Sequence, residues 1–388
     1  MIVERLSLTD FRNYGTADLD LFPGPNVFVG RNGQGKTNLI EAIGFLATLG
    51  SHRVSQDAPM VRDGAQAAII RSRLAHGERR ITLEVQVNRQ GSNRARVNGT
   101  NVRTSELTRY AHVVLFAPED LQIVRGDPSS RRRFADQLLI QRAPRMSATL
   151  ADYDRVLKQR SALLKSARQR GVRGAGLSTL DVWDDKLVAL GTEIIRARAA
   201  LIDALHQPLA QAYSAIAGAD HSPAASWQLS VDAAEDDGEG DRERDWSADS
   251  IAARFREALR VRRGEELDRA VNLVGPHRDD LLLTVRSLPV RGYASHGESW
   301  SVALALRLAS ARLLRAESMV GDPIVILDDV FAELDAGRRA RLASVVADFE
   351  QVLVTAAVGA DVPSELRARE VYVEAGTLVR VAEGSEDD

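Results

Sequence analysis

The chain has 388 residues, of which 44% are hydrophobic and 27% charged, and its formal net charge is −3. It contains no cysteine, which excludes disulfides, thiolate metal sites and cysteine nucleophiles. It also lacks an uninterrupted apolar run of about 18 residues, so we expect a cytoplasmic protein without a membrane partner.

Short apolar runs separated by turns predict strands over the first 120 residues or so. One helix is predicted among them, from Thr37 to Leu49, and the chain region to about residue 120 therefore has α/β character. The predicted strands are Ile2–Leu8, Ala17–Leu21, Asn26–Val29, Ala68–Leu74, Ile81–Val87, Arg94–Val97 and Val113–Ala117.

The middle of the chain has helical periodicity instead. Ser129 is the predicted cap of the first of these helices, and Gly171, Gly174 and Gly176 mark a flexible turn between the second and the third. The acidic segment 231–249 is expected to be a solvated loop. The predicted helices cover Arg131–Gln141, Ala148–Lys165, Thr179–Ala217 and Ser250–Val271.

Strand alternation returns at Asp280–Val285, and the last hundred residues have α/β character. The fold class we predict is therefore α/β, a globular head whose sequence is split around an inserted α-helical arm. The head would comprise residues 1–120 and 272–388, and the arm residues 121–271.

The run from Gly30 to Thr37 fits the phosphate-binding pattern G-x-x-x-x-G-K-[ST] at every fixed position. A strand precedes it and a helix follows it, so backbone N–H groups can point at phosphates from the positive end of that helix. Lys36 would reach the β and γ phosphates of ATP, and Thr37 would ligate Mg²⁺. The predicted cofactor-binding residues of this loop are Gly30, Arg31, Asn32, Gly33, Gln34, Gly35, Lys36 and Thr37.

A second apolar strand, Pro323–Leu327, ends in two carboxylates, as in the Walker B motif. Asp328 would hold Mg²⁺, and Asp329 would orient or deprotonate the attacking water. Asp328 follows Lys36 by 292 residues, far more than in compact P-loop kinases and GTPases. This spacing suits a head whose two sequence segments flank an arm.

Ser295-His296-Gly297-Glu298 precedes an apolar helix, Val302–Leu314, and resembles the signature loop of ABC-type ATPases. A Ser-x-x-Glu run of this kind is also an ordinary helix cap. Asp335, just after Walker B, matches the D-loop aspartate of the same superfamily. Since signature residues of that superfamily complete the nucleotide site of the opposite subunit, the resemblance implies an ATP-dependent homodimer that uses Ser295, Gly297, Glu298 and Asp335.

Further motifs resemble the RecF family of bacterial recombinational repair proteins along essentially the whole chain. The most specific is a Gly-Pro-His-Arg-Asp-Asp-Leu element, and the others surround the nucleotide motifs and the entry to the arm. The matching stretches are 8–14, 32–43, 118–121, 124–126, 131–134, 275–281 and 328–335.

The resemblance implies an ATP-dependent DNA-binding protein of recombinational repair and replication-fork maintenance. It would dimerise on ATP, act at gapped or single-strand/double-strand junctions, assist recombinase loading and SOS induction, and have RecR and RecO as partners. The alternatives are the ATPase subunit of a nuclease or defence complex and a transporter ATPase.

Two departures from most ABC and SMC heads predict slow ATP hydrolysis, and the resemblance implies that DNA stimulates it. Asp329 stands where glutamate is usual, and its shorter side chain leaves the base further from water. Thr355-Ala356-Ala357 stands where a switch histidine is expected after the strand Gln351–Val354. The Q-loop residue is either Glu119 or Gln122.

Two basic features have alternative interpretations. His277 is either catalytic or bonded to the backbone in the turn after Gly275-Pro276. The Arg131-Arg132-Arg133 run is either a phosphate-binding stripe or a solvated helix face, and because of helical geometry only part of it could contact DNA at once. Without an evident aromatic-rich platform in the sequence, we expect contact with the duplex backbone rather than base stacking.

Overall fold

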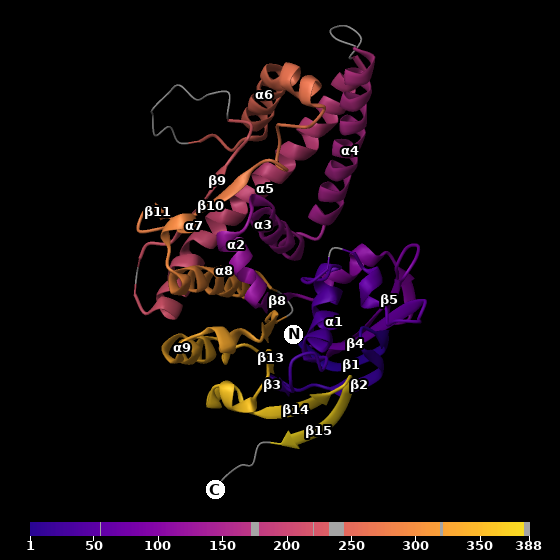
Figure 1. The fold of residues 1–388 in the computed structure, drawn as a ribbon, viewed down its shortest axis with the longest axis vertical. Coiled ribbons are helices and arrows are strands. Elements are labelled where there is room, and N and C mark those ends of the chain that lie inside the picture. Colours follow the sequence, from indigo (N-terminus) through magenta and orange to yellow (C-terminus); the bar gives the residue numbers. More distant parts are fainter. Residues whose placement is uncertain (55, 172–177, 220, 233–243, 319–320, 384–388) are drawn as a thin grey trace. The chain divides into compact units, whose positions relative to one another are not determined.

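The computed structural model describes residues 1–388 except 55, 172–177, 220, 233–243, 319–320 and 384–388 (Figure 1). The chain forms two compact units. The first unit comprises 1–121, 207–222 and 295–388, and the second unit comprises 122–206 and 223–294. Relative to the expected domain limits, residues 272–294 lie in the second unit and residues 207–222 in the first. Among the described helices, none has both the length and the apolar character needed to cross a membrane.

The first unit contains two six-stranded sheets. One is antiparallel, with strand order β2-β1-β4-β5-β6-β7, and the other is mostly parallel, with order β15-β14-β3-β13-β12-β8. The strands of the first sheet are β1 (Ile2–Phe11), β2 (Tyr14–Asp20), β4 (Ala67–His76), β5 (Arg79–Asn88), β6 (Arg94–Val97) and β7 (Thr100–Val102). Those of the second are β3 (Gly24–Val29), β8 (Val113–Phe116), β12 (Ile324–Asp328), β13 (Gln351–Ala356), β14 (Arg369–Glu374) and β15 (Thr377–Glu383).

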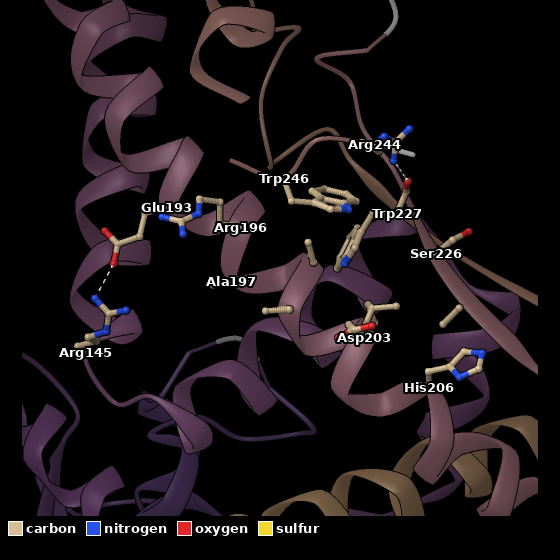
Figure 2. A pocket seen from close by; sticks show the side chains of 14 residues that line it. Arg145, Glu193, Arg196, Ala197, Asp203, His206, Ser226, Trp227, Arg244 and Trp246 are labelled. Atoms are coloured by element: carbon tan, nitrogen blue, oxygen red, sulfur yellow. Dashed lines mark hydrogen bonds and ion pairs between the residues drawn. The ribbon is translucent and has the colours of Figure 1, made fainter. Parts of the chain in front are cut away.

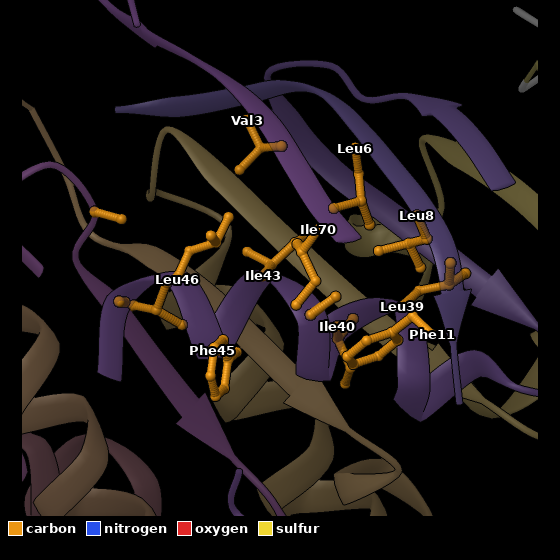
Figure 3. Close-up of a cluster of buried hydrophobic side chains, with 14 of the residues drawn as sticks. Val3, Leu6, Leu8, Phe11, Leu39, Ile40, Ile43, Phe45, Leu46 and Ile70 are labelled. Atoms are coloured by element: carbon orange, nitrogen blue, oxygen red, sulfur yellow. The ribbon is translucent and has the colours of Figure 1, made fainter. Parts of the chain in front are cut away.

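Helix α1 (Lys36–Thr48) shares one apolar core with both sheets. Leu39, Ile43 and Leu46 on α1 lie among side chains of β1 and β4 such as Leu6 and Ile70 (Figure 3). The core therefore fixes the direction of the helix that follows the phosphate loop. The other helices of this unit are α8 (His296–Glu317) and α9 (Ala336–Val346), and the short 3-10 turns are η1 (Ala58–Met60), η2 (Thr104–Arg109), η3 (Pro118–Asp120), η5 (Val330–Glu333), η6 (Gly359–Asp361) and η7 (Ser364–Leu366).

The second unit is built mainly from helices, but it also holds a small sheet of order β11-β10-β9. Strand β9 was not predicted, so the expected arm is not purely helical. The strands are β9 (Ala224–Gln228), β10 (Asp280–Val285) and β11 (Leu288–Pro289). The helices are α2 (Leu121–Arg125), α3 (Pro128–Arg142), α4 (Met146–Arg170), α5 (Ser178–Ala217), α6 (Ala248–Arg269) and α7 (Val290–Tyr293), and α5 continues into the first unit from Gln207.

Several predicted element ends were wrong, for local reasons. Helix α3 begins at Pro128, with Asp127 at the capping position, because proline is favoured in the first helical turn; Ser129 is therefore inside the helix. Helix α6 ends at Arg269, since Ala270 takes a left-handed conformation with φ 54°. Gly171 ends α4 in the same way, with φ 64°. Gly174, Gly176 and most of the acidic segment lie outside the described residues.

A fully buried arginine holds three segments of the second unit together. Arg160 on α4 donates to Asp184 Oδ1 at 2.6 Å, to Asn272 Oδ1 at 2.6 Å and to Glu266 Oε2 at 2.5 Å. The side chains of Arg160 and Glu266 are both 0% exposed. Removal of the guanidinium would leave a buried carboxylate without its counter-charge, which is strongly destabilising.

We therefore predict that Arg160→Ala lowers the free energy of unfolding of this unit by about 3–5 kcal/mol. Arg155→Ala on the same helix is the matched control, because Arg155 is 74% exposed and pairs with Asp152 at the surface. That control should change the free energy of unfolding by less than about 1 kcal/mol. Urea unfolding followed by circular dichroism checks both values, and equal losses in the two variants would contradict the prediction.

Candidate functional site

The topology of the parallel sheet brings the two nucleotide motifs together. Strand β13 lies between β3 and β12 and is parallel to both. The carboxyl ends of these strands share one edge, so the loop after Val29, the end of β12 at Asp328 and the end of β13 are neighbours. Lys36 and Asp328 are 292 positions apart in the chain, and the sheet brings their segments together through a register in which Asp328 stands beside Thr355.

The phosphate loop has a backbone that only glycine fits at two points. A Cβ on Gly30 would lie 2.4 Å from the carbonyl oxygen of Val373. Gly35 has φ 119°, and a Cβ there would lie 2.8 Å from the side chains of both Asn13 and Tyr14. These close approaches explain why the loop needs glycine at both positions.

The loop is held from two sides by parts of the chain that are distant in sequence. The Asn13 amide donates to the Gln34 carbonyl at 3.0 Å, and the Tyr14 hydroxyl donates to the Gly35 carbonyl at 3.1 Å. From the β14–β15 turn, Ala375 N–H donates to Gln34 Oε1 at 2.6 Å and Gly376 N–H to the Gln34 carbonyl at 2.9 Å. Arg31, Asn32 and Gly33 at the tip stay exposed.

Lys36 lies at the first position of α1, with its ammonium turned into the loop. Its Nζ donates to the carbonyl of Gly30 at 2.5 Å and to that of Arg31 at 3.3 Å. Burial lowers the pKa of Lys36, while Asp329 and Asp328 raise it. The ammonium is therefore held at the place where phosphate oxygens would meet the helix N-terminus.

Asp328 is buried and accepts two hydroxyl hydrogen bonds at one oxygen. Thr37 Oγ1 donates to Asp328 Oδ1 at 3.0 Å, and Thr355 Oγ1 donates to the same oxygen at 2.6 Å. The predicted metal-binding pair, Thr37 and Asp328, is therefore in direct contact. A hydroxyl and a carboxylate are hard oxygen donors of the kind Mg²⁺ prefers, so this pair could hold that ion beside phosphates.

Asp329 follows in a left-handed conformation, with φ 54°. Its N–H donates to Thr355 Oγ1 at 3.0 Å, which helps to hold this strained backbone. Aspartate adopts this region more readily than most residues. Burial raises the pKa of Asp329, with Lys36 acting in the opposite direction.

Two residues of this site were missed in the sequence. His52, after α1, has its Nε2 3.7 Å from Asp328 Oδ2, and that nitrogen is buried without a hydrogen-bond partner. Glu41 on α1 is buried; it accepts from Arg12 Nη2 at 2.6 Å and from the Ser51 hydroxyl, and thus fixes the segment that carries His52. The Ser-His-Arg run was not recognised because it matches no nucleotide motif.

A cavity of about 530 Å³ lies beside the phosphate loop in the same unit. It is lined by polar and basic side chains together with small apolar ones. Its hydrogen-bonding side chains include Arg12, Arg53 and Arg89, which only donate, and Asn13 and Asn38, whose amides both donate and accept. Because Asn13 also holds the Gln34 carbonyl of the phosphate loop, this cavity is the candidate place for the base and sugar of a nucleotide.

The signature and D-loop residues form a second cluster. Ser295 caps α8 through a reciprocal pair: its Oγ accepts from Glu298 N at 3.2 Å, and Glu298 Oε2 accepts from Ser295 N at 3.0 Å. Asp335 caps α9 by accepting from Arg338 N at 2.9 Å. Ser295 and Asp335 are exposed, so the cap geometry leaves both helix starts open to a ligand or a second chain.

Arg338 joins these two helix starts and was not predicted. It donates to Ser301 Oγ at 3.0 Å on α8 and pairs with Asp335 on α9. A Cβ on Gly297 would lie 2.9 Å from its guanidinium. Of the two Q-loop candidates, Glu119 lies in the first unit, directly after β8, and Gln122 in the second; both are exposed.

The basic run on α3 is mostly structural. Arg131 is buried and donates to both carboxylate oxygens of Asp280, at 2.6 and 2.9 Å. Arg132 donates to the carbonyl of Asp279 at 2.7 Å. Arg133 alone of the three is exposed, so no three-residue phosphate stripe exists here.

His277 is a half-buried, hydrogen-bonded side chain of the second unit. Its Nδ1 lies 2.9 Å from the Tyr153 hydroxyl, and its Nε2 lies 3.4 Å from the Asn272 carbonyl. The carbonyl can only accept, so the neutral tautomer with a proton on Nε2 satisfies both contacts. Burial lowers the pKa of His277 to about 3.

This pKa gives a pH prediction. In the unfolded chain His277 takes up a proton below its ordinary pKa of 6.5, whereas in the folded chain it does so only near pH 3. Its contribution to the free energy of unfolding therefore decreases as the pH is lowered through this range. Buried Asp279, whose pKa is raised to about 6, acts in the opposite direction.

We therefore compare wild type with His277→Gln, which keeps Asp279. As the pH is lowered from 6 to 4, the free energy of unfolding of wild type should decrease relative to that of His277→Gln by about 1.4 kcal/mol per pH unit. A constant difference in urea unfolding would contradict this.

The sheet order, the glycine loop and the Asp328 carboxylate define an ATPase head of the ABC type. The model of the RecF/RecN/SMC N terminal domain family matches residues 2–365. "DNA replication and repair protein RecF" of Clavibacter sepedonicus is 57% identical over 98% of this chain and 95% of its own, and that of Leifsonia xyli subsp. xyli is 56% identical over 98% of this chain and 99% of its own. The chain belongs to the RecF family of DNA replication and repair proteins.

Solved structures agree with this fold. The "recombination mediator protein RecF-ATPrS in RecFOR pathway" superposes with a TM-score of 0.85 at 25% identity, covering 97% of each chain. An Smc head domain derived from Pyrococcus furiosus superposes with a TM-score of 0.54 at 15% identity, over 98% of this chain and 96% of its own. The predicted α/β fold class is therefore confirmed.

Proposed function

We propose that this chain is an ATP-dependent DNA-binding protein of recombinational repair that hydrolyses ATP slowly and dimerises when ATP binds. The observation that carries the proposal is the convergence of Lys36, Thr37 and Asp328 at one edge of the parallel sheet. The RecF relatives and the RecF-ATPrS and RecF-ATP structures support it.

Each residue of the site has a proposed role. The N–H groups of residues 30–37 and the Lys36 ammonium bind the phosphates, while Thr37 and Asp328 hold Mg²⁺. That ion would neutralise the charge on the phosphate oxygens. Asp329 orients or deprotonates water, and its raised pKa favours the accepting of a proton.

Two features at the carboxyl ends of the parallel strands would make ATP hydrolysis slow. Asp329 is one methylene shorter than the glutamate that is usual at this position, so it reaches less far toward a water molecule. Thr355, where a switch histidine is expected, donates to Asp328 and accepts from the Asp329 N–H. This hydroxyl positions Walker B but has no means of taking a proton at neutral pH.

The dimer and its partners rest on the exposed helix starts and on the family. Ser295, Gly297, Glu298 and Asp335 would complete the nucleotide site of a second copy. RecR and RecO are proposed partners because the RecF structures belong to the RecFOR pathway. Gapped or single-strand/double-strand junctions are the proposed DNA, with stimulation of ATP hydrolysis on binding, a role in SOS induction and a cytoplasmic location.

We predict that Lys36→Arg retains part of the ATP affinity but loses turnover by roughly 100-fold, because a planar guanidinium does not fit the place of a compact ammonium between phosphates. Binding of a fluorescent ATP analogue and phosphate release with a gapped duplex measure the two effects. Lys186→Arg, on the exposed side of α5, is the control and should behave as wild type. Unchanged turnover in Lys36→Arg would argue against the assigned role.

Ser295→Arg should keep ATP affinity and prevent the ATP-dependent dimer, since it places bulk and positive charge at the exposed start of α8. Sedimentation velocity with and without ATP measures this. Ser295→Ala tests loss of the cap alone, and Ser214→Arg adds an arginine elsewhere on the exposed surface of the same unit. Normal dimerisation of Ser295→Arg would rule out the shared nucleotide site.

A further inference from the structure

A cavity of about 870 Å³ lies within the second unit, and none of its lining residues is assigned to ATP. Its walls are helix α5, strand β9 and the segment that leads into α6, and Figure 2 shows the lining side chains gathered around this space. Two of the four tryptophans of the chain line it, together with three arginines. No local pattern indicates this grouping, because its members are up to 101 residues apart, from Arg145 to Trp246.

The two tryptophans differ in what they can offer a ligand. Trp227 is 6% exposed, and its Nε1 donates to the Arg198 carbonyl at 3.0 Å. The Arg198 guanidinium also lies 5.0 Å from its ring centroid, so Trp227 is a fixed wall. Trp246 is 36% exposed, so part of this residue is open to solvent and a flat ring could stack on it.

Arg244 holds the Trp246 segment in place. It donates to the Trp227 carbonyl at 3.1 Å and pairs with Asp232 Oδ2 at 2.8 Å. Its guanidinium lies 5.3 Å from the centroid of the Trp246 ring, within cation–π range. The open ring is therefore a supported surface.

Arginines around the cavity supply positive charge near this ring. Arg145 pairs with Glu193 at 3.2 Å and is 77% exposed at its side chain, so it can also reach an anion. Arg196 on α5 is exposed and has no hydrogen-bond or ion-pair partner among the residues that the structure describes. An exposed guanidinium suits bidentate contact with a phosphate. Ser226, Asp203 and His206 add exposed polar groups at the rim.

We propose that this cavity takes an unpaired nucleobase of single-stranded DNA, stacked on Trp246, with the adjoining phosphate on Arg196. An exposed indole in a cavity that the exposed Arg196 also lines matches a base and its phosphate, whereas duplex DNA keeps its base faces covered. The inference rests on the proposed function and deepens it: a duplex with a single-stranded tail would occupy this site, and a blunt duplex would not. The proposal adds base stacking at this cavity to the duplex-backbone contact expected from the sequence.

The test is fluorescence anisotropy with ATP present, using a labelled blunt duplex, the same duplex with a thymidine tail, and the tail alone. Trp246→Ala should weaken binding of the tailed duplex and of the tail about 10-fold, with blunt-duplex binding unchanged. Trp246→Phe, which keeps a ring, should restore most of the affinity. Trp183→Ala is the matched control, because Trp183 lies on α5 outside the cavity.

Arg196→Ala should reduce the salt dependence for the tail by about one phosphate contact, a slope change near 0.7. Wild-type affinity of Trp246→Ala for both the tailed and the blunt duplex would overturn the inference and leave the cavity to another ligand, such as an acidic aromatic peptide. Equal weakening on both DNAs would also overturn it. If wild type bound none of the three DNAs, the proposed function itself would fail.

Discussion

The Asp328 carboxylate and its two hydroxyl donors are the contact on which the nucleotide site depends. Thr37 comes from the start of α1 and Thr355 from the end of β13, and both donate to Asp328 Oδ1. This shared oxygen aligns the phosphate loop with Walker B across the middle strand of the parallel sheet. Because the carboxylate is buried, loss of either donor would leave it poorly satisfied, so the alignment and the stability of the site are coupled.

Contacts around the phosphate loop also keep it aligned with Walker B. The N-terminal Asn13-Tyr14 pair and the C-terminal turn at residues 375–376 bind the carbonyls of Gln34 and Gly35 from the two ends of the chain. The shared core of α1 and both sheets fixes the helix axis behind them (Figure 3). A phosphate site made from backbone groups needs this support, since it has few side chains of its own.

Local patterns in the sequence predicted the element types, the phosphate loop, Walker B and the capped start of α8, because each of these depends on residues close together in the chain. Contacts between distant segments were beyond such patterns. Three such features are the approach of His52 to Asp328, the bridge made by Arg338, and the placement of Trp227 and Trp246 around one cavity. They depend on sheet order and helix packing. The Arg131-Arg132-Arg133 run shows that a local pattern can also mislead. A basic run of this kind suggests DNA binding, but Arg131 and Arg132 donate to Asp280 and Asp279 within the fold.

The central claim is that ATP bound at this edge holds two heads together. Light-scattering mass of the purified protein without nucleotide, with ADP and with ATP, each with and without a gapped duplex, tests it most directly. The account predicts a monomer without nucleotide and a dimer with ATP that the gapped duplex strengthens. A monomer under every condition, with ATP binding independently confirmed, would contradict it.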